Sequence, residues 1–234
     1  MRALVTGAAG GIGSATVTAL RSAGHTVWTQ DLRAGSAGHI DLEGDLNDAA
    51  HLAAIAAFVR ENGIDTVVAA HGIAAGRALE EVDRAYSDRV MNINTLSFLR
   101  LHDAVREDLE SRSGSYVAIS SQAGLVGEAA NGAYCASKFA LVGWARGMRT
   151  AGTGVRIRIL CPGATETPLL QRAFEGMAEG RGITVEELLA ERSAQIPAGR
   201  LGRTTDLGAA AAWLAALPAP RVLIAPVTGG EVLA

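Results

Sequence analysis

The stretch VTGAAGGIGSA, Val5 to Ala15, decides the fold class of this 234-residue chain. It follows a short β-rich run at residues 2–6 and opens a helical pattern. Glycines in such a turn let the backbone approach a pyrophosphate, and the free N–H groups of the helix N-terminus favour its charge. The context predicts a dinucleotide-binding unit, with a turn that serves only packing as the alternative. The expected cofactor contacts are Gly7, Gly11, Ile12 and Gly13.

Outward from this turn, strand and helix patterns alternate along the whole chain. The expected strands include residues 2–6, 25–31, 64–72, 114–120, 155–163 and 221–230, and the expected helices include residues 12–24, 47–63, 86–109, 133–149 and 205–217. Asn47 is the expected N-cap of the second helix. Alternation at this spacing implies right-handed crossovers and a parallel sheet covered on both faces. We therefore expect an α/β fold, with residues 1–234 forming one Rossmann-type doubly wound domain.

One segment, residues 168–200, breaks this rhythm between a strand and a helix. It is long and contains a single helical pattern at residues 184–194. Insertions of this kind are usually functional, so we expect a lid over a substrate site, with a surface embellishment as the alternative.

The composition excludes several classes of protein. A hydrophobic content of 49% supplies a sizeable core, and a net charge of −3 without a basic block argues against a nucleic-acid partner. Neither the two cysteines nor the five histidines have metal-ligand spacing, so no metal is expected. The longest apolar run, residues 207–217, is too short to span a bilayer. With no signal-like leader, these features predict a soluble, cytoplasmic protein.

A carboxylate, Asp31, ends the second expected strand, about twenty residues after the glycine-rich turn. A carboxylate there accepts hydrogen bonds from ribose hydroxyls and repels a 2′-phosphate, which favours NAD over NADP. Arg33 lies close by and weakens this inference. Asp45 and Leu46, after the third strand, are candidates for lining the adenine; alternatively, Asp45 only precedes or caps the next helix.

Tyr134 and Lys138 are four residues apart in an expected helix and therefore share a face. Lys138 is the only lysine in the chain; the other 20 basic residues are arginines. A neighbouring ammonium favours the phenolate, so the pair predicts a tyrosine with a lowered pKa that acts as a general acid or base. A solvated helix pair is the alternative.

Together the motifs resemble the short-chain dehydrogenase/reductase family, in order and over essentially the whole chain. The matching segments are TGAAGGIG (6–13), NIN (92–94), ISS (119–121), YCASK (134–138), PGATET (162–167), IPAGRLG (196–202) and VTGG (227–230). The resemblance implies hydride transfer between a nicotinamide cofactor and a secondary alcohol or ketone.

The resemblance also implies roles at individual positions. Tyr134 would be the general acid/base, and Lys138 would lower its pKa and hold the nicotinamide ribose. Ser121 would bond the substrate oxygen, chosen over Ser120 because it lies thirteen residues before Tyr134. Asn94, chosen over Asn92, would hold a water in a proton relay to the lysine. The remaining cofactor contacts would be Gly72, Pro162, Gly163, Thr165 and Thr167.

The chain departs from the family pattern after the fourth strand. Ala69, Ala70 and His71 stand before Gly72 where the family usually has Asn-Asn-Ala. His71 could replace a lost hydrogen bond, and a ring satisfied by nearby backbone is the interpretation favoured over a catalytic histidine. Arg158 falls within the sixth strand, where burial predicts a carboxylate or several carbonyls beside it.

The expected pocket is walled by residues 122–133, by the region after Gly72 and by the 168–200 lid. These segments are mostly small and apolar, which favours a small-to-medium apolar alcohol or ketone, cyclic ones included. The long fourth helix and the Tyr134 helix carry apolar residues beyond those that the sheet needs: Leu99, Leu101, Phe139 and Trp144. The resemblance implies that these helices pair between subunits, so we expect a homotetramer, with a homodimer second.

Three functions compete at this point. The first is an NAD-dependent alcohol dehydrogenase. The second is a 3-oxoacyl-type carbonyl reductase using NADPH, which Asp31 opposes. The third is a nucleotide-binding regulatory protein without turnover, which the intact serine, tyrosine, lysine and asparagine set opposes.

Overall fold

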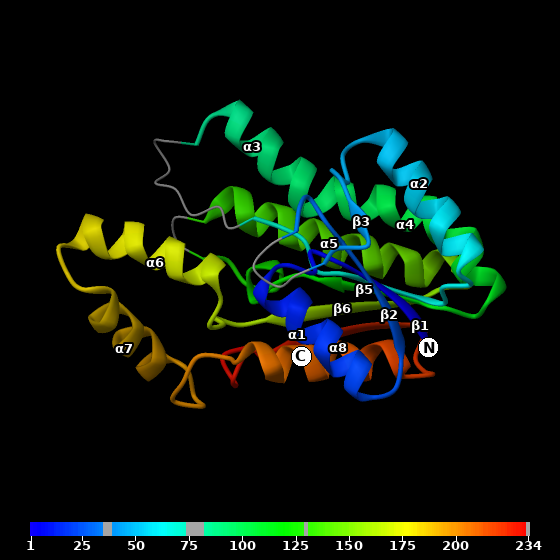
Figure 1. Ribbon diagram of the computed structural model, residues 1–234. Coiled ribbons are helices and arrows are strands. Elements are labelled where there is room, and N and C mark those ends of the chain that lie inside the picture. Colours follow the sequence, from blue (N-terminus) through cyan, green and yellow to red (C-terminus); the bar gives the residue numbers. More distant parts are fainter. Residues whose placement is uncertain (35–38, 74–81, 129–130, 233–234) are drawn as a thin grey trace.

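The computed structural model describes residues 1–34, 39–73, 82–128 and 131–232, and it is built around one seven-stranded sheet (Figure 1). The strands are β1 (Arg2–Thr6), β2 (Thr26–Asp31), β3 (Leu42–Glu43), β4 (Thr66–Ala69), β5 (Ser115–Ile119), β6 (Arg156–Pro162) and β7 (Val222–Val227). They run parallel in the order β3-β2-β1-β4-β5-β6-β7. The predicted doubly wound fold is confirmed, and its strand order reverses between β1 and β4.

Helices cover both faces of the sheet because the central strands are apolar on both sides (Figure 1). Helices α1 (Gly11–Ser22) and α8 (Thr204–Ala216) pack together on one face. Helices α2 (Ala49–Glu61), α4 (Ser97–Ser111) and α5 (Gly132–Ala151) cover the other. Every residue of β4 and β5 is buried. Each face of the sheet therefore has its own apolar core, and polar groups of a site are to be expected at the ends of the strands.

The predicted long helix at residues 86–109 is interrupted. Helix α3 (Arg84–Met91) continues through one π-helical turn, Asn92–Leu96, into α4. Such a turn inserts one extra residue per turn and re-aims its side chains, and π turns occur frequently at functional sites. Asn94 lies within this turn and is fully buried.

The insertion at residues 168–200 holds two helices where the sequence predicted one. Helix α6 (Pro168–Arg181) begins at the Thr167 N-cap, and α7 (Val185–Gln195) begins with a capping box at Thr184. The two helices share a small apolar cluster of Phe174, Ala178 and Leu188. They stand beyond the carboxyl ends of the strands (Figure 1).

Three local predictions can be compared with the structure. The N-cap of α2 is Asp48 rather than Asn47, because the Asp48 carboxylate accepts the Ala50 N–H. Arg158 is fully buried and donates to the carbonyls of Ile157, Arg221 and Leu217, which confirms the predicted carbonyl partners. Leu101 lies in the core and is not available to a partner subunit.

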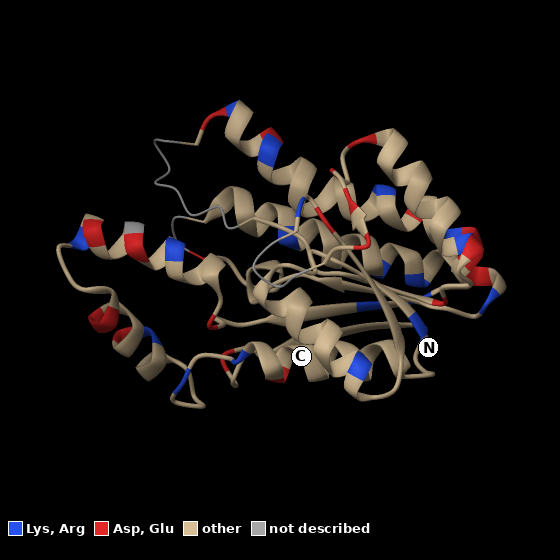
Figure 2. Ribbon diagram, viewed as in Figure 1, with Lys and Arg blue, Asp and Glu red and all other residues tan. Residues whose placement is uncertain are grey.

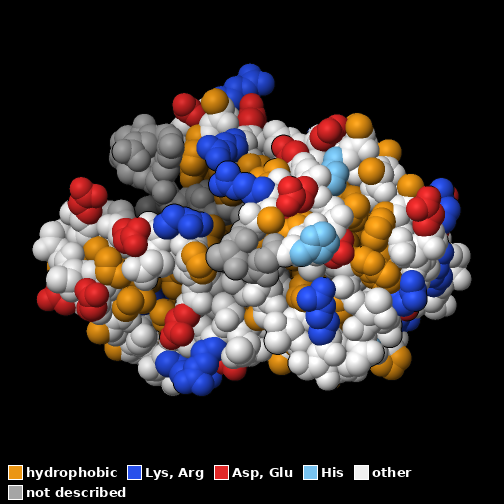
Figure 3. Space-filling model, viewed as in Figure 1, with side chains coloured by type: hydrophobic (Ala, Val, Ile, Leu, Met, Phe, Trp, Pro, Cys, Tyr) orange, Lys and Arg blue, Asp and Glu red, His pale blue; other side chains and the backbone are white. Residues whose placement is uncertain are grey.

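Charges of both signs are interspersed along the described helices and over the face drawn in space-filling form (Figures 2 and 3). Within the described residues, no helix is both long enough and apolar enough to cross a membrane.

Candidate active site

The motifs singled out in the sequence converge at the carboxyl edge of the sheet, beside the reversal of strand order between β1 and β4. In doubly wound sheets, ligands bind in the crevice at this point. The glycine-rich turn follows β1, His71 and Gly72 follow β4, Ser121 follows β5, and Gly163 follows β6. Segments far apart in the sequence thus share one site because all four strands end at the same edge.

The glycine-rich turn leaves no room for side chains. Gly7 has a φ of +64°, and a Cβ on it would lie 2.5 Å from the His71 backbone nitrogen. A Cβ on Gly13 would lie 2.1 Å from the Gly7 carbonyl oxygen. Helix α1 has Gly10 as its N-cap, without a side-chain cap, and has no acidic residue in its first turn. Its free N–H groups and the close backbone therefore fit the pyrophosphate of a dinucleotide.

Residues 162–167 lie against this turn. A Cβ on Gly11 would meet the Thr167 methyl group at 3.0 Å. Thr167 accepts the Leu170 N–H at the start of α6 and donates to the Thr165 carbonyl, while Thr165 donates to the Gly163 carbonyl. Gly163 in turn donates its N–H to Val227 at the end of β7. This chain of bonds fixes the segment after Pro162 next to the place where a cofactor would lie.

The three residues expected to contact the adenosine half of the cofactor differ in how accessible they are. Asp31 is partly exposed, and its carboxylate accepts the N–H groups of Ala9, at 2.9 Å, and Leu32, at 2.7 Å. It is therefore tied directly to the glycine-rich turn. Asp45 is exposed and accepts the Asn47 N–H, so it precedes α2 without capping it. Leu46 packs in the core with only 6% of its surface exposed, which leaves only its backbone for a ligand.

Ser121 and Tyr134 are brought together from two elements. Ser121 is the N-cap of a short 3₁₀ turn, Gln122–Gly124, and accepts the Ala123 N–H. Tyr134 lies in the first turn of α5, with the Ser121 side chain close enough to lower its pKa. A carbonyl or alcohol oxygen placed between these two hydroxyls would contact both, which is the geometry that general acid–base chemistry at oxygen requires.

The predicted direction of the Tyr134 pKa is wrong for the protein alone. Burial raises the pKa of Tyr134 to about 12, the Ser121 hydrogen bond opposes this, and the nearby Glu128 charge adds to it. The Lys138 ammonium lies 5.7 Å from the centre of the tyrosine ring and donates to the Ile119 carbonyl instead. The protein alone therefore holds Tyr134 protonated, ready to donate a proton.

Lys138 is buried, with 4% of its surface exposed. Its Nζ donates to the Ile119 carbonyl at 3.1 Å and lies 5.3 Å from the centre of the Phe98 ring. Burial lowers the pKa of Lys138 to about 8. The lone lysine is thus a charge held in the interior at an energetic cost, which excludes the alternative of a solvated helix pair.

Asn94 is placed by the π turn against the loop after β4. Its Oδ1 accepts the Ile73 N–H at 2.8 Å, and its Nδ2 donates to the Ile73 carbonyl at 3.0 Å. A Cβ on Gly72 would lie 3.2 Å from Asn94 Oδ1 and 3.7 Å from Lys138 Nζ. Asn94, Gly72 and Lys138 therefore border one small space, whereas the competing Asn92 bonds back to its own helix.

His71 braces the site through hydroxyl groups, and the favoured interpretation of a backbone-satisfied ring is wrong. Its Nδ1 lies 2.7 Å from Thr6 Oγ1 and its Nε2 lies 2.8 Å from Ser97 Oγ. The ring also stacks on Phe98, with the ring centres 3.9 Å apart. Burial, with the Lys138 charge adding to it, lowers the pKa of His71 to about 3. A neutral ring thus ties β1 to α4, the bracing that the missing asparagines would supply.

Sequence reasoning missed a polar group in the wall that it described as mostly small and apolar. Gln122 donates from Nε2 to Glu128 Oε1 at 3.1 Å, and Asn131 donates from Nδ2 to Glu128 Oε2 at 2.9 Å. The available signal was Glu128 itself, the only charged residue between Gln122 and Ala133.

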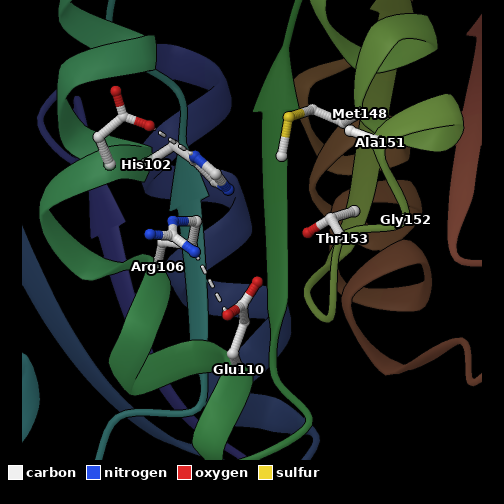
Figure 4. Close-up of a pocket in the computed structure, with 8 residues that line it drawn as sticks. His102, Arg106, Glu110, Met148, Ala151, Gly152 and Thr153 are labelled. Carbon is white, nitrogen blue, oxygen red and sulfur yellow. Dashed lines mark hydrogen bonds and ion pairs between the residues drawn. The ribbon is translucent and has the colours of Figure 1, made fainter.

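A separate hollow of about 450 Å³ lies between α4 and the C-terminal end of α5 (Figure 4). In it His102 lies 3.3 Å from Asp103, and Arg106 lies 3.4 Å from Glu110. These polar groups pair with one another, and the hollow lies at the opposite end of α5 from Tyr134, so we do not assign it to the reaction site. No cluster of three potential metal ligands occurs among the residues that the structure describes.

Comparison with known proteins places the chain in a family. Residues 1–178 match the family model described as short chain dehydrogenase. The chain is 34% identical to D-threitol dehydrogenase of Mycolicibacterium smegmatis, over 91% of this chain and 85% of the relative. It is 30% identical to the 3-oxoacyl-[acyl-carrier-protein] reductase of Vibrio cholerae, over 91% and 88%.

Structural comparison agrees on the fold. The solved structure of Thermoplasma acidophilum aldohexose dehydrogenase superimposes with a TM-score of 0.89 at 23% identity, covering 98% of this chain and 93% of that one. The family match, the sheet order and the closely packed glycine-rich turn lead to one conclusion: the chain belongs to the short-chain dehydrogenase family and is an oxidoreductase that uses a nicotinamide cofactor.

Proposed function

We propose that this protein is an NAD-dependent oxidoreductase that interconverts a small-to-medium secondary alcohol, cyclic ones included, and its ketone. The observation that carries the proposal is the placement of Ser121 close enough to Tyr134 to lower the pKa of that tyrosine, with buried Lys138 one helical turn further along α5. The alternative of a binding module without turnover gives no reason to hold a lysine charge in the interior.

The chemistry divides between the cofactor and the protein. The nicotinamide supplies or accepts the hydride when bound. In reduction, Tyr134 donates its proton to the carbonyl oxygen while the Ser121 hydroxyl donates a hydrogen bond to the same oxygen. In oxidation, the same tyrosine accepts the proton of the alcohol. Lys138 would return a proton to Tyr134 after reduction and accept one from it after oxidation, with Asn94 and Gly72 bordering the same space.

The proposed cofactor contacts follow the geometry of the turn and of the neighbouring strand ends. The pyrophosphate would lie on Gly7, Gly11, Ile12 and Gly13, the nicotinamide on Gly72, Tyr134, Lys138, Pro162, Gly163, Thr165 and Thr167, and the adenine near Asp45 and the Leu46 backbone. Asp31 favours NAD over NADP as the cofactor. Its carboxylate accepts the Ala9 N–H and is thereby held beside the glycine-rich turn, and in that position it would repel a 2′-phosphate.

A 3-oxoacyl-type carbonyl reductase that uses NADPH is the second candidate. Exposed Arg33 lies two residues beyond Asp31 and would suit a phosphate, and one relative carries that activity in its name. The negative charge of Asp31 would repel the 2′-phosphate of NADPH and therefore argues against this candidate.

Two further features belong to the proposal. Helices α6 and α7, within residues 168–200, would act as the substrate lid, since they stand beyond the strand ends and carry exposed Leu169 and Met177. Phe139 on α5 and Leu96 in the π turn are exposed apolar residues that would be covered in a homotetramer or a homodimer.

The test is a set of initial-rate measurements with secondary alcohols and ketones, each with NAD(H) and with NADP(H), followed by nicotinamide absorbance. We expect turnover with alcohols and NAD, and a lower kcat/KM with NADP. Preference for NADPH with 3-oxoacyl substrates would favour the second candidate. Tight cofactor binding without turnover of any substrate would refute both.

A further inference from the structure

Three polar residues in the wall beside Tyr134 form what we call the acceptor cluster: Gln122, Glu128 and Asn131. The Glu128 carboxylate accepts one hydrogen bond from each of the two amides, on different oxygens. Gln122 is buried, with 9% of its surface exposed, while Glu128 and Asn131 are half-buried. The cluster therefore places a carboxylate and two amides together where the rest of the wall is apolar.

The carboxylate fixes the orientation of both amides. Because it has only acceptors, each amide must turn its NH₂ group toward it and its oxygen away. Gln122 Oε1 and Asn131 Oδ1 are both buried and accept no hydrogen bond from any residue that the structure describes. A buried acceptor without a donor costs about 1–3 kcal/mol, so a donor from a bound molecule that reached either oxygen would be favourable there.

Each member of the cluster lies near a reacting group, either along the chain or in space. Gln122 follows Ser121 directly, and its unpaired oxygen would lie 3.1 Å from a Cβ on Gly163. Asn131 is the N-cap of α5, three residues before Tyr134. The Glu128 charge is close enough to Tyr134 to contribute to raising the pKa of that tyrosine. A group bound at the cluster would therefore belong to the same molecule as the oxygen bound by Ser121 and Tyr134.

From this geometry we infer that the substrate carries a second hydroxyl group, which donates to the acceptor cluster while the first reacts at Tyr134. The inference rests on the proposed function and narrows its substrate to uncharged diols, polyols and hydroxyketones with an apolar remainder. A hydroxyl supplies the missing donor without adding charge. A substrate with a carboxylate at this end would instead bring a second negative charge against Glu128, in a largely buried place where repulsion is weakly screened.

The test compares four-carbon alcohols that share the CH3–CH(OH) end and differ in the remaining two carbons: 2-butanol, 2,3-butanediol and 3-hydroxybutanoate. For each we would measure kcat/KM with the preferred cofactor, and repeat the comparison with cyclohexanol and 1,2-cyclohexanediol. We expect the diols to be preferred over the mono-alcohols about 10- to 100-fold, the range for a hydrogen bond to a charged or otherwise unpaired buried group. The anionic 3-hydroxybutanoate should be the poorest of its series.

Variants connect this preference to the cluster. In Glu128→Gln the ratio of diol to mono-alcohol kcat/KM should fall by about 10-fold or more, and 3-hydroxybutanoate should gain relative to 2-butanol. Gln122→Met removes the unpaired oxygen at similar volume and should lower the same ratio. Glu107→Gln is the matched control, because Glu107 is 86% exposed on α4 and should leave the ratio unchanged. Circular dichroism would establish that each variant is folded.

The outcomes separate this inference from the proposed function. Turnover of mono-alcohols and diols at similar rates, or a preference that neither cluster variant alters, would overturn the inference and leave the proposed function standing. A preference for 3-hydroxybutanoate would overturn it as well. Absence of turnover with every alcohol and either cofactor would refute the proposed function, and the inference with it.

Discussion

Replacing Lys138 with methionine should stabilise the protein while it abolishes turnover. Burial lowers the pKa of Lys138 from 10.5 to about 8. Each pKa unit corresponds to about 1.4 kcal/mol, so holding this ammonium charged at pH 7 costs about 3 kcal/mol. Methionine fills a similar volume without charge. Loss of the hydrogen bond to the Ile119 carbonyl offsets about 1 kcal/mol of the gain. The free energy of unfolding at pH 7 should therefore rise by about 2 kcal/mol.

The stability difference between Lys138→Met and wild type should also depend on pH. The folded pKa lies below the unfolded one, so the unfolded chain binds more protons between pH 8 and 10.5, and Lys138 makes wild-type stability rise across that window. The difference between variant and wild type should accordingly shrink by about 2 kcal/mol from pH 7 to pH 10. Urea titrations followed by circular dichroism, at one fixed protein concentration, would measure it.

Arg146→Met is the control, because Arg146 is an exposed cation on the same helix and its replacement should change stability by less than about 0.5 kcal/mol. A Lys138→Met protein that is less stable than wild type at pH 7 would refute the reasoning. So would a stability difference that does not change with pH.

Three other perturbations follow from the site. The pKa of His71 falls from 6.5 to about 3 on folding, so the stability that the neutral ring contributes is lost as the pH drops below 6.5. Through this ring, the free energy of unfolding of the wild type should fall by about 2 kcal/mol between pH 7 and pH 5. In the same urea titrations, the stability of His71→Asn should fall less steeply over this range. Asp31→Ser should weaken NAD binding about 10-fold and raise the ratio of NADP to NAD kcat/KM; an unchanged ratio would contradict the placement of the ribose. Gly13→Ala should raise the NAD dissociation constant at least ~10-fold by calorimetry, because its Cβ would overlap the Gly7 carbonyl; Gly147→Ala, whose Cβ meets open space, should not.

Much of the fold could be predicted because its signals are local. The glycine positions and the strand–helix alternation each depend on a few neighbouring residues, and the parallel sheet follows from them. The family resemblance likewise led to Ser121 and Tyr134, which the fold brings close together.

The remaining features depend on distant residues. The partners of His71 lie 65 and 26 residues away, on β1 and α4, so no local pattern shows that they are hydroxyls. The pKa of Tyr134 rises because of burial, which is a property of the packed site and outweighs the effect expected from Lys138. Leu46 occupies the core because α2 packs over it, although its position in the sequence resembles that of a ligand-lining residue.

The central claim is that Tyr134 transfers the proton in an NAD-dependent oxidation, and one comparison tests it most directly. The rate of NADH formation with the best secondary alcohol would be measured for Tyr134→Phe and for Tyr116→Phe, which loses a buried tyrosine hydroxyl outside the site, where it donates to the Phe98 carbonyl. NAD affinity would be measured in parallel by calorimetry. The account predicts a loss of at least ~100-fold in kcat for Tyr134→Phe with NAD affinity nearly retained, and no comparable loss for Tyr116→Phe. Equal rates in the two variants would contradict it.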